Sequence, residues 1–264
     1  MEIRPARDAD YAAFTQLFPE LRVDDPTPSV ETWRAKMLAT TLVADDGGEA
    51  IGYLYFDAFA EEGHVRHVAV APAYHGKRIG QRLMERAAEL MRARGLTRWA
   101  LNVKPDNASA IRLYERMGLR PTFTSQALRF DWELTERLPA APGLIAFRIE
   151  PARDADVEAA MKLSPGQLAT ARLVHDNVLV AVEDMRTIVA AGVFAPGFPG
   201  AYPFRAASPS AARGLLEALR PHARAEPPYM QVVVEGQPEL AAAMREAGAL
   251  LRLDIVHYEG QLAG

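Results

Sequence analysis

A repeated segment is the feature that most constrains how this chain can fold. Residues 3–10 read IRPARDAD, and residues 149–156 read IEPARDAD. Each copy has the pattern of a strand followed by a helix that starts at an aspartate. Later segments correspond in the same order: LVADD at 42–46 with VAVED at 180–184, and the helix end at Gly118 with one at Gly248. A repeat this long indicates two duplicated domains.

A stretch with two prolines separates the copies. Residues 138–143 read LPAAPG, a composition that favours a turn or linker. We therefore expect a first domain at residues 1–137, a linker at residues 138–146 and a second domain at residues 147–264. The order of strand-like and helix-like segments predicts an α/β fold for each domain, with a mixed, mostly antiparallel central sheet flanked by helices.

A glycine-containing turn in the first copy joins a short apolar strand to an amphipathic helix. The strand is VRHVAV at 65–70, and the turn is HGKRIG at 75–80. The helix places its apolar residues at intervals of three and four: Leu83, Ala87, Leu90 and Met91. Its first turn has unpaired amides and the positive end of the helix dipole. Two glycines admit a ligand and two cations add charge, so the turn is suited to a diphosphate.

Other nucleotide-binding loops fit this turn poorly. A Walker loop needs Ser or Thr after its lysine, whereas Arg78 follows Lys77 here, and no Gly-x-Gly-x-x-Gly segment occurs in the chain. A DNA-binding module built on the same helix would need a second helix at turn spacing. The sequence does not predict one.

A second motif follows the strand-like residues 99–103. Residues 107–119 read NASAIRLYERMGL. Asn107, or Asp106 beside it, can cap the start of a helix, and Gly118 suits the left-handed position after its end. The apolar face of this helix consists of Ala110, Leu113, Tyr114 and Met117.

The two motifs together resemble the GNAT superfamily of N-acetyltransferases. The family's phosphate loop reads Arg/Gln-x-x-Gly-x-Gly/Ala, which corresponds to residues 75–80. Its later helix reads Asn-x-x-Ala-x-x-x-Tyr-Glu-x-x-Gly-Phe, which Asn107, Ala110, Tyr114, Glu115 and Gly118 match in place. The resemblance covers about residues 1–135. His75 and Arg78 depart from the family loop, and we expect Arg78 to adopt ordinary helical dihedral angles.

The resemblance implies that acetyl-CoA is the cosubstrate of the first domain. Residues 65–70 and 98–103 would form a parallel pair that splays apart at its C-terminal ends, so that the pantetheine arm bonds to strand amides, chiefly those of Val68 and Val70. The implied cofactor-binding residues are Val68, Ala69, Val70, His75, Gly76, Lys77, Arg78, Ile79, Gly80, Asn102, Asn107 and Tyr114. Strict alternation would place Arg66, Val68 and Val70 on one strand face and Val65, His67 and Ala69 on the other.

Acetyl transfer requires a proton or hydrogen bond for the leaving thiolate. A phenol with a pKa near ~10 can supply it, and Tyr114 is therefore the candidate general acid. The alternative is a tyrosine that only packs on the apolar helix face. Many family members carry a glutamate base where Arg66 stands, and arginine cannot serve as a base.

His64 is the candidate general base because a histidine titrates near neutral pH. His67, Asp57, Glu61, Glu62 and a water relay remain alternatives. Arg66 is a candidate for binding an acceptor carboxylate, and Asp25, in the loop between the first two helices, for attracting an ammonium group.

The second copy lacks these features. RAASP at 205–209 stands where the first copy has its glycine turn. When Gly248 is aligned with Gly118, Met244 stands opposite Tyr114 and Gln237 opposite Asn107. We therefore predict a degenerate domain that acts as a scaffold, lid or dimer surface, without its own acetyl-CoA site.

Together these features predict an acetyl-CoA-dependent N-acetyltransferase, an acyltransferase of groups other than aminoacyl groups. Its acceptor would be the amine of a small molecule such as an amino acid, polyamine or antibiotic, attacking directly in a ternary complex. The alternative is a catalytically silent acyl-CoA-binding or regulatory protein. The acyl-chain length and the acceptor are not predicted.

Composition limits the other partners. The net charge of −4 and the pI near 5.9 argue against nucleic acid or an anionic membrane. No apolar run approaches ~18 residues, and the N-terminus lacks the apolar core of a signal peptide, so we expect a cytoplasmic protein. The chain has no cysteine, which excludes thiolate metal ligands and a cysteine acyl intermediate. We expect no metal, and the sequence leaves a homodimer open.

Overall fold

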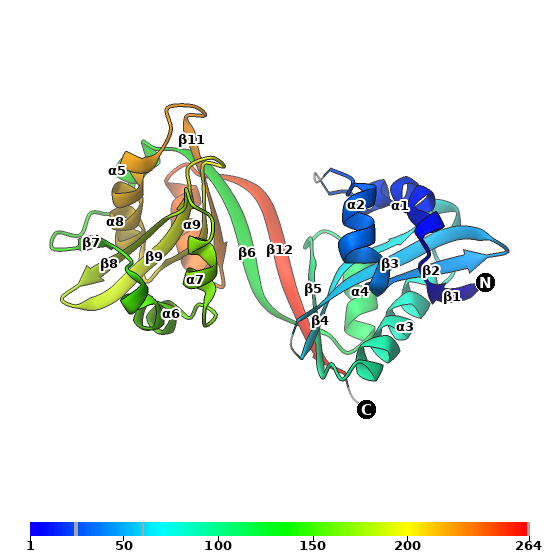
Figure 1. Cartoon of the computed structure of the whole chain (residues 1–264). Helices are drawn as coiled ribbons and strands as arrows, with labels where there is room; N and C mark the ends of the chain where they lie inside the picture. Colours follow the sequence, from blue (N-terminus) through cyan, green and yellow to red (C-terminus); the bar gives the residue numbers. More distant parts are fainter. Residues whose placement is uncertain (24–25, 60, 263–264) are drawn as a thin grey trace. The chain divides into compact units, whose positions relative to one another are not determined.

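The computed structural model describes residues 1–23, 26–59 and 61–262, and it divides into two compact units (Figure 1). Unit 1 consists of Met1–Thr122 and Val256–Gly264, and unit 2 of Phe123–Ile255. Both units have a mixed sheet flanked by helices, which confirms the predicted α/β class.

Unit 1 is built on a sheet with the strand order β1-β2-β3-β4-β5-β12. Only β4 and β5 are parallel; the other neighbours in this order pair antiparallel. The strands are β1 (Glu2–Pro5), β2 (Thr41–Asp46), β3 (Glu49–Phe59), β4 (Glu62–Val70), β5 (Arg98–Val103) and β12 (Leu250–Gln261). The helices are α1 (Tyr11–Leu17), α2 (Val30–Thr32), α3 (Ile79–Ala93) and α4 (Ala108–Arg116).

Two apolar clusters cover the two faces of the unit 1 sheet. Tyr53 and Tyr55 of β3 belong to a cluster with α1 and the segment after α2. Leu54 and Phe56, which alternate with them, belong to the cluster formed with α3 and α4. Successive strand side chains point to opposite faces, so one strand serves both cores. Leu54 and Phe56 are completely buried, which stabilises the fold by about 1.5–3 kcal/mol each.

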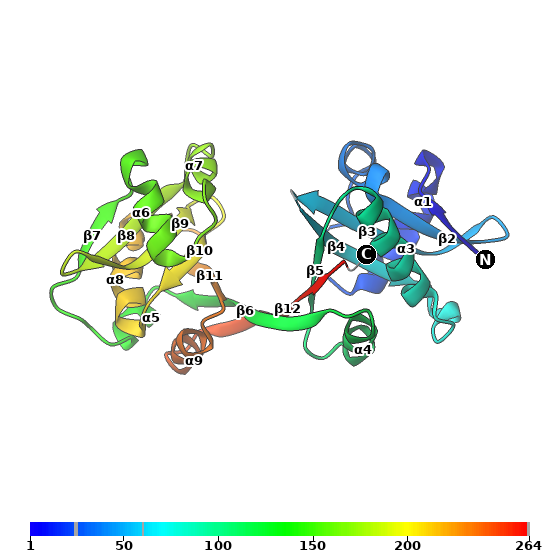
Figure 2. The ribbon, with the colours of Figure 1, turned by 90° about the horizontal axis from the view of Figure 1, so that it is seen from below.

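Unit 2 repeats this plan with the strand order β6-β11-β10-β9-β8-β7. Its parallel pair is β10 and β11. Figure 2 shows α6 and α7 on one face of the sheet and α8 and α9 on the other. The strands are β6 (Arg120–Asp131), β7 (Ile145–Arg148), β8 (Val178–Asp184), β9 (Thr187–Ala195), β10 (Gly200–Ala206) and β11 (Tyr229–Glu235). The helices are α5 (Leu134–Arg137), α6 (Asp154–Met161), α7 (Gln167–Arg172), α8 (Pro209–Leu219) and α9 (Pro238–Glu246).

The two sequence copies exchange one strand each. β6 comes from the first copy but pairs with β11, from Tyr229↔Asp131 to Glu235↔Ser125. β12 comes from the second copy but pairs with β5, from Gln261↔Arg98 to Val256↔Val103. The compact units therefore differ from the expected domains at residues 1–137 and 147–264.

The units differ from the expected domains because β6 with the residues after it and the end of β12 are buried in the core of the other copy. Trp132, Leu134 and Leu138 all lie in the main core of unit 2. Tyr258 and Leu262 lie in the α3 and α4 core of unit 1. Apolar burial and hydrogen bonds between strands thus decide to which unit each segment belongs. The proline-rich stretch shows only where regular secondary structure is interrupted.

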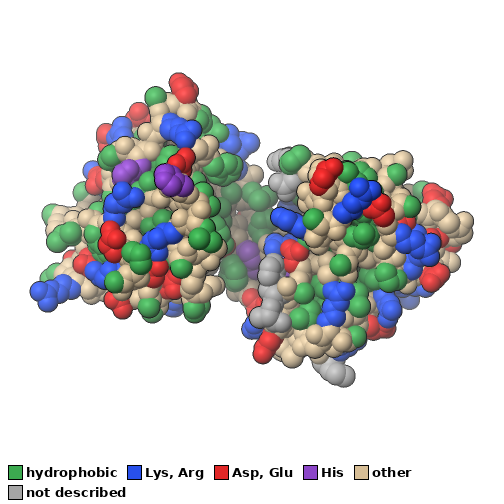
Figure 3. Space-filling view, viewed as in Figure 1, with side chains coloured by type: hydrophobic (Ala, Val, Ile, Leu, Met, Phe, Trp, Pro, Cys, Tyr) green, Lys and Arg blue, Asp and Glu red, His purple; other side chains and the backbone are tan. Residues whose placement is uncertain are grey.

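The surface is mixed in charge. On the face drawn in Figure 3, Lys and Arg side chains alternate with Asp and Glu side chains over both units. Among the described residues, no helix combines the length and apolar character needed to cross a bilayer.

Candidate active site

The parallel strands β4 and β5 of unit 1 separate part-way along their length. They pair only from Glu62↔Arg98 to Val65↔Leu101. β4 continues to Val70, bonded on its other side to β3, and β5 continues to Val103, bonded to β12. This is the predicted splay at the C-terminal ends. Beyond Val65, β4 no longer pairs with β5, so an extended ligand can add to the sheet at Val68 and at the Val70 amide, while the Val70 carbonyl contacts His75.

A β-bulge in β4 marks the point of separation. Tyr55 pairs with His67, whereas Phe56 pairs with Val65, so Arg66 is an extra residue in the strand. A bulge shifts the alternation of side chains. Val65 consequently lies in the same core as Val68 and Val70.

The predicted alternation was therefore wrong at the bulge. It holds for His67 and Ala69, which contact the opposite cluster. It fails at Val65, and also at Arg66, which bonds to Asp57 next to Tyr55 of that opposite cluster. Strict alternation applies only to an unbroken ladder.

The turn between β4 and α3 presents unused amides. The first helical bond of α3 runs from Arg82 N to Arg78 O, at 3.1 Å. The amides of Ile79, Gly80 and Gln81 precede it, and no side chain caps the helix. At Gly76, with φ of 76°, a Cβ would meet nothing within 4 Å. A 15-residue helix with a free first turn fits the diphosphate of a CoA molecule.

Arg78 departs from expectation. Its φ is 59° and its ψ is 19°, which is the left-handed region. The prediction of ordinary helical angles was therefore wrong. The backbone at this position keeps the shape that a glycine would favour, and an arginine holds it at some cost in strain.

The other side chains of the turn have distinct surroundings. His75 Nε2 lies 2.8 Å from Val70 O and ties the turn to the end of β4. Lys77 Nζ lies 4.5 Å from the centre of the Tyr74 ring. Ile79 is buried in the core, so only its backbone faces a ligand at the helix start. His75, Lys77 and Arg78 are exposed.

Tyr114 lies on the buried face of α4. It belongs to the same core as Leu83 and Val103 and is 8% exposed. Burial raises the pKa of Tyr114 to about 12. The phenol is therefore protonated at neutral pH, which a proton donor requires, although burial also makes it a weaker acid.

A polar network occupies the opposite face of the sheet, beside the bulge. Arg66 Nε donates to Asp57 Oδ2 at 2.8 Å, and the Tyr55 hydroxyl also donates to Asp57. His64 pairs with Asp57 across the ladder, and its side chain is 16% exposed. Burial, helped by the Arg66 charge, lowers the pKa of His64 to about 4. His64 is neutral at pH 7 and is a weak base.

Residues 7–119 match the model of the acetyltransferase (GNAT) family. This segment is a GNAT acetyltransferase domain. The general chemistry of that family is acetyl transfer from acetyl-CoA. The matched residues contain the β4–β5 split, the turn before α3 and Tyr114.

Solved structures with the same fold extend over the whole chain. A GCN5-related N-acetyltransferase from Sphaerobacter thermophilus aligns with 100% of this chain and 96% of its own, with a TM-score of 0.69 and 18% identity. A tandem GNAT protein from the clavulanic acid biosynthesis pathway aligns with 100% of this chain and 99% of its own, with a TM-score of 0.56 and 18% identity. The two units together thus have the fold of a tandem GNAT protein.

Three further residues were predicted to belong to the site: Asn107, Asn102 and Asp25. The Asn107 side chain accepts from Ala110 N at 3.2 Å and caps α4. Asn102 is exposed on β5, just past the split, and pairs with His257 of β12. Asp25 lies outside the described residues. Among the described residues, no cluster of three or more His, Asp or Glu side chains could hold a metal ion.

β12 completes the sheet and the core of the GNAT domain, which the sequence did not predict. Tyr258 is buried beside α4, and burial together with the Glu115 carboxylate raises its pKa. A Cβ at Gly260 would lie 2.8 Å from Trp99 Nε1 and 3.2 Å from Gly118 O. Glycine thus lets β12 pass close to the end of α4. Only the place of a glycine inside a strand indicated this close approach.

In unit 2 the corresponding strands stay together. β10 and β11 still pair at Phe204↔Val234, close to the end of both strands. The Gln237 side chain then continues the contact, since its Nε2 donates to Ala206 O. The start of α8 is capped, because Ser208 Oγ accepts from Ala211 N at 3.1 Å and Pro209 is the first helical residue. Among these described residues, β10 and β11 therefore present no open strand edge and α8 no free helix start.

Proposed function

We propose that the GNAT domain transfers an acetyl group from acetyl-CoA to the amine of a small molecule. The observation that carries this proposal is the β4–β5 split directly before the uncapped start of α3. An extended arm can occupy the split while its diphosphate meets the helix amides. We also propose that one CoA binds per chain, because in unit 2 the β10–β11 pair stays together and the start of α8 is capped.

The chain's own residues would bind the cosubstrate through backbone more than side chains. Amides from Gly76 to Gly80 hold the diphosphate, and Lys77 and Arg78 add positive charge. Backbone groups of Val68 and Val70 bond to the pantetheine arm. Acetyl-CoA supplies the activated thioester.

The transfer is a direct displacement. The neutral amine attacks the thioester carbonyl, a C–N bond forms, and the C–S bond breaks. The Val68 amide stabilises the oxygen that becomes negative. Tyr114 donates its hydroxyl proton to the departing thiolate and regains a proton from solvent.

The attacking amine also has to lose a proton. His64 carries a free lone pair at neutral pH, but its pKa of about 4 makes it a poor acceptor. We propose that His64 passes the proton through water rather than holding it. Arg66, anchored by Asp57, is proposed to orient an acceptor carboxylate.

A screen for free thiol tests this function. Purified protein with acetyl-CoA is offered single amino acids, polyamines, aminoglycosides and short peptides, and released CoA thiol is measured. We expect amine-dependent release for one class. CoA binding without release for any amine would instead support the alternative, a silent acyl-CoA-binding protein.

A further inference from the structure

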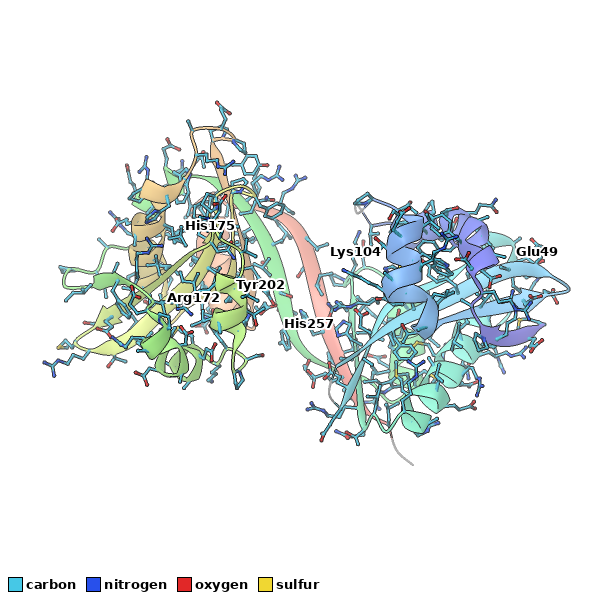
Figure 4. All side chains as sticks on the ribbon, in the orientation of Figure 1. Glu49, Lys104, Arg172, His175, Tyr202 and His257 are labelled. Atoms are coloured by element: carbon cyan, nitrogen blue, oxygen red, sulfur yellow. The ribbon has the colours of Figure 1, made fainter. Side chains whose placement is uncertain are left out.

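A cavity of about 470 Å³ lies in unit 2 and is lined by residues of that unit alone. One wall is the α6–α7 segment at residues 162–170, and the other consists of Tyr202 and Arg205 of β10 and Glu235 of β11. Figure 4 shows Tyr202 beside α7. The volume falls within the range of small-molecule sites, about 300–1,000 Å³.

The strand wall holds an incompletely bonded cation. Arg205 Nη2 donates to Glu235 Oε2, and the Tyr202 hydroxyl donates to Glu235 Oε1 at 3.2 Å. The side chains of Arg205 and Glu235 are 19% and 16% exposed. Arg205 Nη1 is buried, and no described residue accepts a hydrogen bond from it. Leaving such a donor without an acceptor is unfavourable, so the wall favours a ligand with acceptor oxygens.

The helix wall is held in place by its own bonds. The buried Glu158 carboxylate accepts from Gly166 N at 3.0 Å and from Leu168 N at 2.9 Å. Gln167 Oε1 accepts from Ser164 N at 3.1 Å. A wall ordered before binding loses little entropy when a ligand arrives. Lys162 is exposed at its edge and adds a second cation.

The charges of the lining indicate the class of ligand. Lys162 and Arg205 are positive and Glu235 is negative, so the cavity carries one excess positive charge. A guanidinium with an open edge suits a carboxylate. The Glu235 carboxylate has about four acceptor positions and uses two of them here, which leaves room for a ligand hydroxyl or ammonium. A phosphate dianion would be repelled more strongly by Glu235 than a monocarboxylate.

We propose that this cavity binds a small carboxylic acid that also carries a hydroxyl or amino group. Unit 2 binds this ligand without acetyl transfer, because its strand pair and helix start are closed to CoA. The degenerate unit is thus a ligand-binding module rather than only a scaffold. This site stands on residues of unit 2 alone and does not depend on the proposed transferase activity.

Calorimetry on the intact protein tests the site. The probes are the individual L-amino acids, lactate, malate and tartrate, with propionate, succinate and inorganic phosphate for comparison. We expect at least one hydroxy or amino acid to bind with a stoichiometry of one. Its analogue without the hydroxyl or amino group should bind at least ~10-fold more weakly, because Glu235 then has no new donor.

Three variants locate the binding. Lys162→Met should weaken the selected probe by about 10-fold and Arg205→Gln should abolish binding, while Lys36→Met, an exposed lysine of unit 1, changes nothing. CoA affinity should stay the same in each. If Arg205→Gln fails to fold, Tyr202→Phe, which removes one bond to Glu235, takes its place.

Several results would overturn the assignment. These are the absence of binding by every probe, tighter binding of phosphate than of the acids, or affinities that Lys162→Met and the strand-wall variants leave unchanged. The last result would place the probe elsewhere, for example at the acceptor side of the GNAT domain.

Discussion

The parallel strand pairs of the two units start from the same plan and end differently. In unit 1, β4 and β5 stop pairing at Val65↔Leu101, and β4 carries a bulge at Arg66. In unit 2, β10 and β11 still pair at Phe204↔Val234, and the Gln237 amide bonds to Ala206 beyond them. A few residues at the strand ends therefore decide whether this fold offers a ligand an open sheet edge.

The helices that follow these strands differ in the same way. The first turn of α3 is uncapped, whereas α8 has Ser208 as its cap and Pro209 in its first turn. An amide that bonds to its own cap is not available to an anion. The second copy thus has the same plan of core but a capped helix start, because core packing and helix capping depend on different residues.

The largest expected effect comes from removing residues 250–264, which include β12. Unit 1 would lose its ladder along β5 and the buried Tyr258 and Leu262. We expect loss of CoA binding and of cooperative unfolding in unit 1, measured by calorimetry and thermal circular dichroism.

A matched control adds residues 250–262 to the truncated chain as a separate peptide, which should restore CoA binding in part. Normal CoA binding by a fragment of residues 1–137 would contradict the exchanged-strand description, since that fragment also lacks β12.

Tyr114→Phe should lower kcat by roughly 10²-fold with little change in acetyl-CoA affinity, since only the proton donor is lost. The aligned variant in unit 2, Met244→Leu, should leave kcat unchanged. Full activity of Tyr114→Phe, with a lower melting temperature, would instead assign Tyr114 a packing role only.

Gly80→Gln should weaken CoA binding by about 10-fold or more, because a side chain at the helix start crowds the diphosphate. In the free protein a Cβ at Gly80 would meet Leu113 Cδ2 only at 3.4 Å, so the fold should tolerate it. Ser210→Gln, at the same helix position of α8, is the control and should have no effect. Unchanged affinity in calorimetry would remove the loop from the CoA site.

Gln237→Ala removes the bonds to Ala206 and should cost about 1–2 kcal/mol of stability in urea unfolding. We expect the stoichiometry of CoA to remain one, because β10 and β11 are also joined by their own ladder. A titration that reaches two equivalents would show that the glutamine alone keeps unit 2 closed.

The smallest expected effect concerns the pH dependence of stability. The pKa of His64 is about 4 in the folded chain, below its ordinary value of 6.5. Between these values the unfolded chain holds a proton that the folded chain lacks, so stability rises with pH across this window.

In urea unfolding near pH 5 and pH 7, the His64→Gln variant should therefore show a smaller increase than the unmodified protein. His175→Gln, at a fully exposed site in unit 2, should keep the full increase. Equal increases in the protein and both variants would contradict the buried position of His64.

Patterns that are local in the chain could be predicted from the sequence. The repeat indicated two α/β domains, Asn107 indicated the start of α4, and Gly118 indicated the left-handed position after its end. Each of these depends on contacts within a few residues, such as a cap, a positive φ or a period of apolar side chains. The absence of a glycine turn at 205–209 led to the prediction that the second copy has no acetyl-CoA site of its own, which stays a prediction.

The bulge, the strained Arg78 and the exchanged strands were decided by the tertiary structure. A ladder register depends on the partner strand, so one sequence cannot show that Arg66 is an extra residue in the register of β4 against β3. Arg78 keeps the left-handed backbone because β4 and α3 hold both ends of the turn. β6 and β12 are corresponding strands of the two sequence copies, so the sequence alone does not show which sheet each strand joins. The burial of Trp132 in the core of unit 2 and of Tyr258 in the core of unit 1 decides this.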